Sequence, residues 1–142
     1  MKVKRADLLL SVIAAAEGET VTPAQLQKVA FLVGKKFPDD VPGNYYRFKK
    51  YDYGPFCVDI YRDAEKLQCQ GLVLVQVNPR GGWKEYSATQ KGLATAANIE
   101  SNSMTKYIVK KVKWARSVSF QELVREIYKK YPAYRENSVF QD

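Results

Sequence analysis

The chain has 142 residues, of which 46% are hydrophobic and 27% are charged, and this composition excludes an intrinsically disordered protein. It has no histidine and only two cysteines, which excludes histidine-based general base catalysis and a cysteine-histidine zinc site. Lysine and arginine outnumber aspartate and glutamate by 23 to 15, and the net charge of +8 favours polyanionic partners such as nucleic acid.

We therefore expect a non-enzymatic protein with no cofactor or metal, folded as one domain over residues 1–142. The longest apolar run, Leu8 to Ala16 with Ser11 inside it, is about half of the roughly 20 residues that a transmembrane helix needs. This predicts a cytoplasmic protein with no membrane partner. Cys57 and Cys69 lie 12 positions apart in one expected helix, so about 18 Å of rise keeps them apart as reduced thiols.

Two helices are expected in the first 36 residues. Residues 4–17 contain helix-forming residues without a breaker and end at Gly18, the residue type favoured after a helix C-terminus. A second helix over 23–36 is predicted by Thr22 as N-cap and Pro23 at the first helical position. Its apolar residues follow helical spacing and are expected to face the first helix: Leu26, Val29, Ala30, Val33 and Phe37.

Aromatic residues crowd the next segment, "YYRFKKYDYGPF". We expect a short extended stretch around residues 46–48, after which Gly54 and Pro55 end it and begin a third helix. In that helix an apolar face is expected to be buried, and Gly71 is expected to end the helix; the face consists of Phe56, Ile60, Ala64 and Leu67.

A β-hairpin is predicted over residues 72–88, where "NPRGG" separates two runs of strand-forming residues. Thr89 is expected to cap a helix, and further helices are expected over 104–116 and 119–131, the last with the capping pattern of Ser119 and Glu122. The order predicts an α+β, mostly helical fold. It has a winged helix-turn-helix core over about 4–100, a hairpin wing and a C-terminal helical extension over about 101–142.

Several motifs together resemble the Panacea family of SocA-like antitoxin domains and the similar YwgA-like bacterial proteins. They are "LQKVAFLV", "YRFKKYDYGPFCVDIYRDAEKLQCQGLV" and "YSATQKG", and the likeness covers about residues 23–92. The segment "SFQELVREIYKKYPAYRENS" also looks like the tails of YwgA-like proteins. The resemblance implies a bacterial, phage or mobile-element protein with a winged-helix core. It also implies a role in neutralising a toxin by direct binding or in DNA-bound regulation.

The third helix is a poor candidate for reading DNA bases. Between Phe56 and Gln70 its charged residues sum to −1, and its outward positions at 100° per residue are Val58, Arg62, Glu65 and Cys69. Positive charge lies elsewhere, so phosphate contacts with weak sequence preference are expected. The candidate nucleic-acid-binding residues are Arg47, Lys49, Lys50, Arg62, Arg80, Lys84, Lys106, Lys110 and Lys113. The alternatives are a solvated outer helix face for 106–113 and ordinary turn polarity for Arg80 and Lys84.

The aromatic segment has two interpretations. Mixed with basic residues, it suits stacking of single-stranded bases or a protein-binding hot spot; the candidate protein-binding residues are Tyr45, Tyr46, Tyr51, Tyr53 and Arg62. Alternatively Phe48, Tyr53 and Phe56 pack in the core. Asp59 and Asp63 lie one helical turn apart, and surface salt bridges with Arg62 or Lys66 are expected to account for them better than a shared metal or proton.

Two functions remain open from the sequence. The first is a nucleic-acid-binding regulator whose partner is DNA, and the second is an antitoxin-like module whose partner is a protein such as a toxin. A homodimer is compatible with either function.

Overall fold

The structure is a computed structural model, and it describes residues 3–140. Its two antiparallel hairpins form separate sheets, so the described chain is an α+β protein. The helices are α1 (Arg5–Ala14), α2 (Pro23–Lys36), α3 (Asp59–Cys69), α4 (Gln90–Ala97), α5 (Ser103–Ser117) and α6 (Phe120–Lys130), followed by the 3₁₀ helix η1 (Pro132–Arg135). The strands are β1 (Lys49–Tyr51), β2 (Gly54–Phe56), β3 (Val73–Val77) and β4 (Lys84–Ala88).

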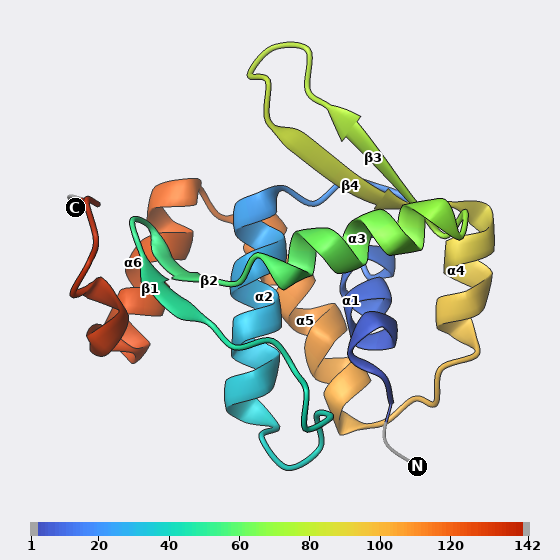
Figure 1. The fold of residues 1–142 in the computed structure, drawn as a ribbon, viewed down its shortest axis with the longest axis horizontal. Coiled ribbons are helices and arrows are strands. Elements are labelled where there is room, and N and C mark those ends of the chain that lie inside the picture. The colour runs from blue at the N-terminus through green and yellow to red at the C-terminus, as the bar shows by residue number, and fades with distance from the viewer. Residues whose placement is uncertain (1–2, 141–142) are drawn as a thin grey trace.

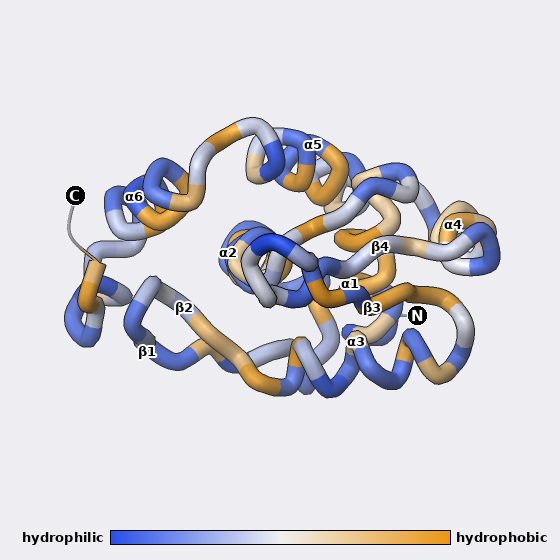
Figure 2. Tube along the Cα trace, turned by 90° about the horizontal axis from the view of Figure 1, so that it is seen from above, coloured by the Kyte–Doolittle hydropathy of each residue, from blue (hydrophilic) through white to orange (hydrophobic). Residues whose placement is uncertain are grey.

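Helix α2 lies at the centre of the molecule (Figure 1). Seen from above, α3 and the β1–β2 hairpin lie on one side of it, and α5 and α6 lie on the other (Figure 2). This position explains why burial on α2 extends beyond the predicted stripe to residues that a one-sided helix would expose. Those residues are Gln27, Lys28, Phe31 and Leu32.

The two helices predicted in the first 36 residues are both present as α1 and α2. Helix α1 ends at Ala14, three residues before the predicted end, and turns continue the chain to Gly18. Helix α2 has the predicted bounds. The Thr22 side chain accepts a hydrogen bond from the Gln25 N–H at 3.2 Å, and the Gln25 side chain accepts one from the Thr22 N–H at 2.9 Å. This reciprocal cap satisfies two backbone donors that a helix N-terminus otherwise leaves free.

The expected start of the third helix at Gly54 and Pro55 is wrong, because these residues form β2. Strand β2 pairs antiparallel with β1, with Lys49 opposite Phe56 and Tyr51 opposite Gly54. Gly54 has a φ of 103°, a left-handed value that does not occur inside an α-helix.

The segment after β2 is held extended by a side chain from α2. The Gln27 amide donates a hydrogen bond to the Cys57 carbonyl and accepts one from the Cys57 N–H, both at 2.9 Å. Helix α3 therefore begins only at Asp59, and Cys57 lies outside it. Of the predicted apolar face, Ile60, Ala64 and Leu67 are buried, whereas Phe56 is half-buried on the hairpin.

The predicted hairpin over 72–88 is confirmed, with Val73 opposite Ala88 and Val77 opposite Lys84. Val21, between α1 and α2, extends this sheet through a bridge to β4. Its N–H donates to the Tyr86 carbonyl at 2.8 Å, and the Tyr86 N–H donates to the Val21 carbonyl at 2.9 Å. The distal half of the hairpin projects away from the helices (Figure 1).

The expected C-terminal helices are present with small changes at their ends. Thr89 caps α4 by accepting a hydrogen bond from the Gly92 N–H at 3.0 Å, and Ser119 caps α6 by accepting one from the Glu122 N–H at 3.1 Å. Helix α5 buries Met104, Ile108, Val112 and Ala115 against the rest of the core.

Candidate functional site

The two basic residues predicted for the wing lie at the exposed end of the β3–β4 hairpin. Arg80 is in the turn, where its N–H donates a hydrogen bond to the Asn78 side-chain oxygen at 2.8 Å. Lys84 begins β4 opposite Val77, which is 62% exposed. Neither basic side chain forms an ion pair within residues 3–140. Both therefore carry a charge available to an external anion.

The predicted lysine stripe on α5 is exposed. Lys106, Lys110 and Lys113 lie opposite the buried residues of that helix, as the helical spacing indicates. Figure 2 shows the same division, with hydrophilic residues of α5 on its outer side and hydrophobic residues toward the interior. The geometry fits both predicted interpretations, a solvated face and a surface for phosphates.

The fold also gathers lysines that the sequence reasoning missed. We call Lys36, Lys110, Lys111 and Lys130 the lysine cluster; they come from the C-terminal ends of α2 and α6 and from the middle of α5. Burial lowers the pKa of Lys111, and the positive charges of Lys130, Lys110 and Lys36 lower it further. The Lys111 ammonium lies 5.3 Å from the centre of the Trp114 ring.

The lysine cluster has little acidic compensation. Glu126 lies beside Lys111 and Lys130 around a hollow of about 100 Å³, but it forms no ion pair among the described residues. The lysines at the end of α2 are visible in the sequence as cations that suit a helix C-terminus. Their proximity to α5 and α6 has no sequence signal, because 74 positions separate Lys36 from Lys110.

The predicted aromatic interface divides into an exposed part and a buried part. Tyr51 and Tyr53 are 53% and 45% exposed, so they are available to a partner. Tyr46 is only 5% exposed, which corrects its prediction as a contact residue. Tyr45 is half-buried, and its hydroxyl donates a hydrogen bond to the Ala30 carbonyl at 2.6 Å. Burial raises the pKa of both inward-facing tyrosines.

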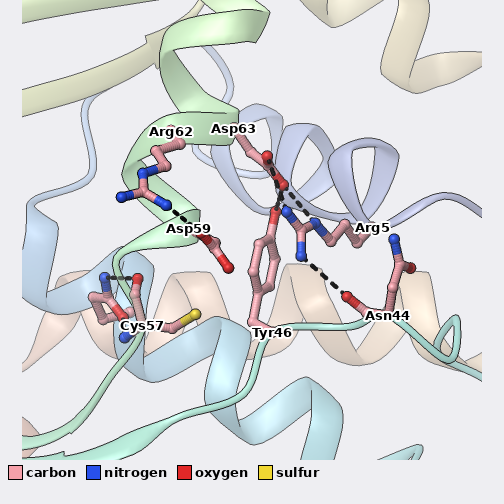
Figure 3. A network of polar contacts seen from close by, with 8 residues as sticks. Arg5, Asn44, Tyr46, Cys57, Asp59, Arg62 and Asp63 are labelled. Carbon is pink, nitrogen blue, oxygen red and sulfur yellow. Dashed lines mark hydrogen bonds and ion pairs between the residues drawn. The ribbon is translucent and has the colours of Figure 1, made fainter.

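Tyr46 is held by a polar network that joins α1, α3 and the loop before β1 (Figure 3). Its hydroxyl donates a hydrogen bond to the Asp63 carboxylate at 2.6 Å, and Arg5 donates one to the same oxygen at 2.9 Å. Arg5 also donates to the Asn44 carbonyl at 3.1 Å. The predicted surface salt bridge of Asp63 with Lys66 is therefore wrong: Asp63 is buried, and its charge is matched by Arg5.

The predicted pair of Asp59 and Arg62 is confirmed, with 3.2 Å between the carboxylate oxygen and the guanidinium nitrogen. It lies on a different face of α3 from Asp63 (Figure 3). The outward positions predicted for this helix are exposed as well; they are Val58, Arg62, Glu65 and Cys69. Because Asp63 is buried, the charges left toward solvent are those of Asp59, Arg62, Glu65 and Lys66, which sum to zero rather than to the predicted −1.

The basic residues before and within β1 have different surroundings. Lys50 forms an ion pair with Glu136, and this hydrogen-bonded contact lowers the pKa of Glu136. The C-terminal segment adds hydrogen bonds from Ser138 and Val139 to the Asp52 carbonyl. Lys50 is thus engaged within the chain, which weakens its candidacy for phosphate binding. Arg47 and Lys49 are exposed and form no ion pair among residues 3–140.

Comparisons of the chain with protein-family models, curated proteins and solved structures found no match. Among the described residues, none of the helices is both long and apolar enough to cross a membrane. Over the same range, no cluster of three or more cysteine, aspartate or glutamate side chains is arranged to hold a metal ion. Both cysteines, Cys57 and Cys69, are free thiols.

Proposed function

We propose that the protein is a non-enzymatic nucleic-acid-binding protein that contacts phosphates with little sequence preference. The observation that carries this proposal is the distribution of unpaired positive charge. Ion pairs within residues 3–140 engage Arg5, Lys50 and Arg62, while the wing, the α5 stripe and the lysine cluster have no carboxylate partner. Clustered cations repel one another, and a polyanion relieves that repulsion.

The proposal includes a winged-helix core formed by α1, α2, α3 and the β3–β4 hairpin. Its support is the order of these elements together with the bridge from Val21 to β4, which adds a short third strand from between the first two helices. In such a fold the third helix normally enters the major groove. Here the Asp59–Arg62 pair and Glu65 occupy the outer face of α3, so we assign the contacts to the wing and to lysines.

Replacing Arg80 and Lys84 together by alanine is expected to weaken binding to unrelated DNA duplexes about equally. Each phosphate contact releases counterions from the DNA when the protein binds. The loss of two contacts should therefore flatten the slope of log affinity against log salt concentration by about two units. Fluorescence anisotropy titrations at several salt concentrations measure both quantities.

A matched control removes two charges from α6 by replacing the exposed residues Arg125 and Lys129 with alanine. Its affinity should change less, because the wing is intact. Absence of DNA affinity of the parent protein at low salt would refute the proposed function.

A second candidate function is an antitoxin-like protein that neutralises a partner by direct binding. It is favoured by an exposed apolar surface around the β1–β2 hairpin, where the Tyr53 and Phe120 rings lie 5.3 Å apart. Tyr51 stacks on Phe56 at 5.0 Å beside them. Aromatic residues and arginine are the residue types that dominate protein interfaces, and Arg62 is exposed on α3.

The test of this second function is a Tyr51→Ala, Arg62→Ala double variant. Truncating a central hot-spot residue typically costs more than about 2 kcal/mol, which is a loss of about thirtyfold or more in affinity. The variant should stay folded, keep its DNA affinity and fail to co-purify with a toxin encoded by an adjacent gene. Equal co-purification by the variant and the parent would remove this surface from consideration, and Lys49→Ala on the same hairpin serves as the control.

A further inference from the structure

A pocket of about 420 Å³ lies between the C-terminal half of α2, the loop before β1 and η1. This volume falls within the roughly 300–1,000 Å³ of small-molecule sites. Its lining combines aromatic rings with two cations: Phe31, Lys35, Tyr45, Arg47, Phe48 and Tyr134. Neither residue of the Arg5–Asp63 ion pair lines this pocket, and no residue of the β3–β4 hairpin does. Tyr46, which donates a hydrogen bond to Asp63, also borders the pocket.

The aromatic wall is preformed. Phe31 is fully buried, and the rings of Phe48 and Tyr134 meet it edge-on with centres 5.3 and 4.8 Å away. On the opposite side of the loop, Tyr45 is fixed by its hydrogen bond to the Ala30 carbonyl. Its ring lies so close to α2 that a Cβ at Gly34 would be 2.8 Å from a ring carbon. A planar ligand would therefore meet walls whose rotamers are already set.

The cations of the pocket are held by aromatic rings rather than by ion pairs among residues 3–140. The Lys35 ammonium lies between 5.5 and 5.9 Å from the centres of the Phe31, Tyr131 and Tyr134 rings, an arrangement that orients the charge without neutralising it. Neither Lys35 nor Arg47 forms an ion pair within the described part of the chain. Asp39 also lines the pocket, so the lining carries a net charge of +1 from two cations and one carboxylate.

We propose that this pocket binds one nucleotide, with the base against the half-buried rings of Tyr45, Phe48 and Tyr134 and the phosphate at Lys35 and Arg47. Stacking is available to any base because every base has a π-face, and the two cations supply donors for the phosphate. The proposal rests on the proposed nucleic-acid-binding function and specifies an unpaired nucleotide of a single strand as the ligand. Lys36 follows Lys35 at the end of α2, so a strand leaving the pocket would meet the lysine cluster.

The test uses a Lys35→Ala, Arg47→Ala double variant of the full chain with two probes, AMP and a fluorescein-labelled twelve-residue oligothymidylate. Calorimetry should show AMP binding to the parent and at least about a tenfold weaker binding to the variant, since two charge-assisted contacts are lost. Anisotropy should show the same loss for the oligothymidylate, while duplex affinity changes little because the wing is intact. A control variant, Arg125→Ala with Lys129→Ala, removes the same charge from outside the pocket.

Tyr134→Leu provides an independent variant that keeps both cations and removes a stacking surface. This variant should bind both AMP and the oligothymidylate more weakly than the parent does. Circular dichroism checks that its fold is retained. Equal binding of AMP and oligothymidylate by the parent and the pocket variants, or no AMP binding by the parent, would overturn the nucleotide site. AMP binding without any duplex affinity would instead refute the proposed duplex-binding function and leave the pocket assignment intact.

Discussion

At the scale of single residues, Lys28 is the most unusual side chain of the core. It is 5% exposed in the middle of α2 and forms no hydrogen bond or ion pair among the described residues. The end of its side chain packs near Gly54 of β2 and Tyr128 of α6. Burial lowers the pKa of Lys28 to about 8, because a charged ammonium loses hydration that nothing in the protein replaces.

Lys28 is expected to make stability rise with pH. The pKa is about 8 in the folded protein and about 10.5 in the unfolded chain, so the unfolded chain binds more protons between these values. The free energy of unfolding should therefore increase by about 3 kcal/mol from pH 8 to 10.5. Lys28→Met should remove this rise and be more stable than the parent at pH 7, as urea denaturation from pH 7 to 10 would measure.

Comparing the parent with Lys28→Met separates the effect of Lys28 on stability from the effects of other titrating groups. Buried tyrosines act in the opposite direction: burial raises the pKa of Tyr86 to about 12, so its contribution to stability is lost only as pH rises above about 10. That effect is common to the parent, to Lys28→Met and to an exposed control, Lys129→Met. A parent whose stability is flat from pH 7 to 10, or a Lys28→Met variant with the parent's slope, would contradict the expectation.

At the scale of elements, the junction between the β3–β4 hairpin and α4 shows why "YSATQKG" ends in glycine. The Thr89 hydroxyl donates a hydrogen bond to the Gly71 carbonyl at 2.7 Å, and the same oxygen caps α4. Gly92 then passes so close to the hairpin that a Cβ there would lie 1.9 Å from the Leu72 carbonyl oxygen. The motif therefore fixes the direction in which α4 leaves the hairpin.

Gly92→Ala tests this close approach because two effects oppose each other. Helix propensity alone favours alanine by about 1 kcal/mol. The clash is with backbone, which cannot rotate away, and overpacking of this kind typically costs about 1–3 kcal/mol. We expect a lower midpoint of chemical denaturation than the parent. Gly43→Ala is the control, since nothing lies within 4 Å of its added Cβ; a more stable Gly92→Ala variant would show that α4 shifts freely.

At the scale of the whole molecule, the basic residues of the β3–β4 hairpin and of the lysine cluster lie on other elements than the exposed tyrosines. The β3–β4 hairpin projects away from the helices (Figure 1), the lysine cluster joins α2, α5 and α6, and exposed tyrosines lie on the β1–β2 hairpin. This separation is what allows the nucleic-acid and protein-binding functions to be tested with independent variants.

Local patterns in the sequence determined the α-helices apart from their exact ends, the β3–β4 hairpin, the caps at Thr22, Thr89 and Ser119, and the exposed faces of α3 and α5. They did not determine the β1–β2 hairpin, where a helix start was predicted at Gly54 and Pro55. The features that they determined depend on spacing and on hydrogen bonds within a few residues, so they are readable from neighbours along the chain. The same is true of the pair formed by Asp59 and Arg62, three positions apart on one helix.

Only the tertiary structure decided which candidate residues remain available to a ligand. Asp63 pairs with Arg5 across 58 positions, and Lys50 pairs with Glu136 across 86, so neither partner is visible from local spacing. Gln27 likewise holds Cys57 30 positions away and keeps the segment after β2 out of α3. Such contacts arise because packing brings distant segments together, and a buried polar group then requires a partner from whichever segment lies beside it.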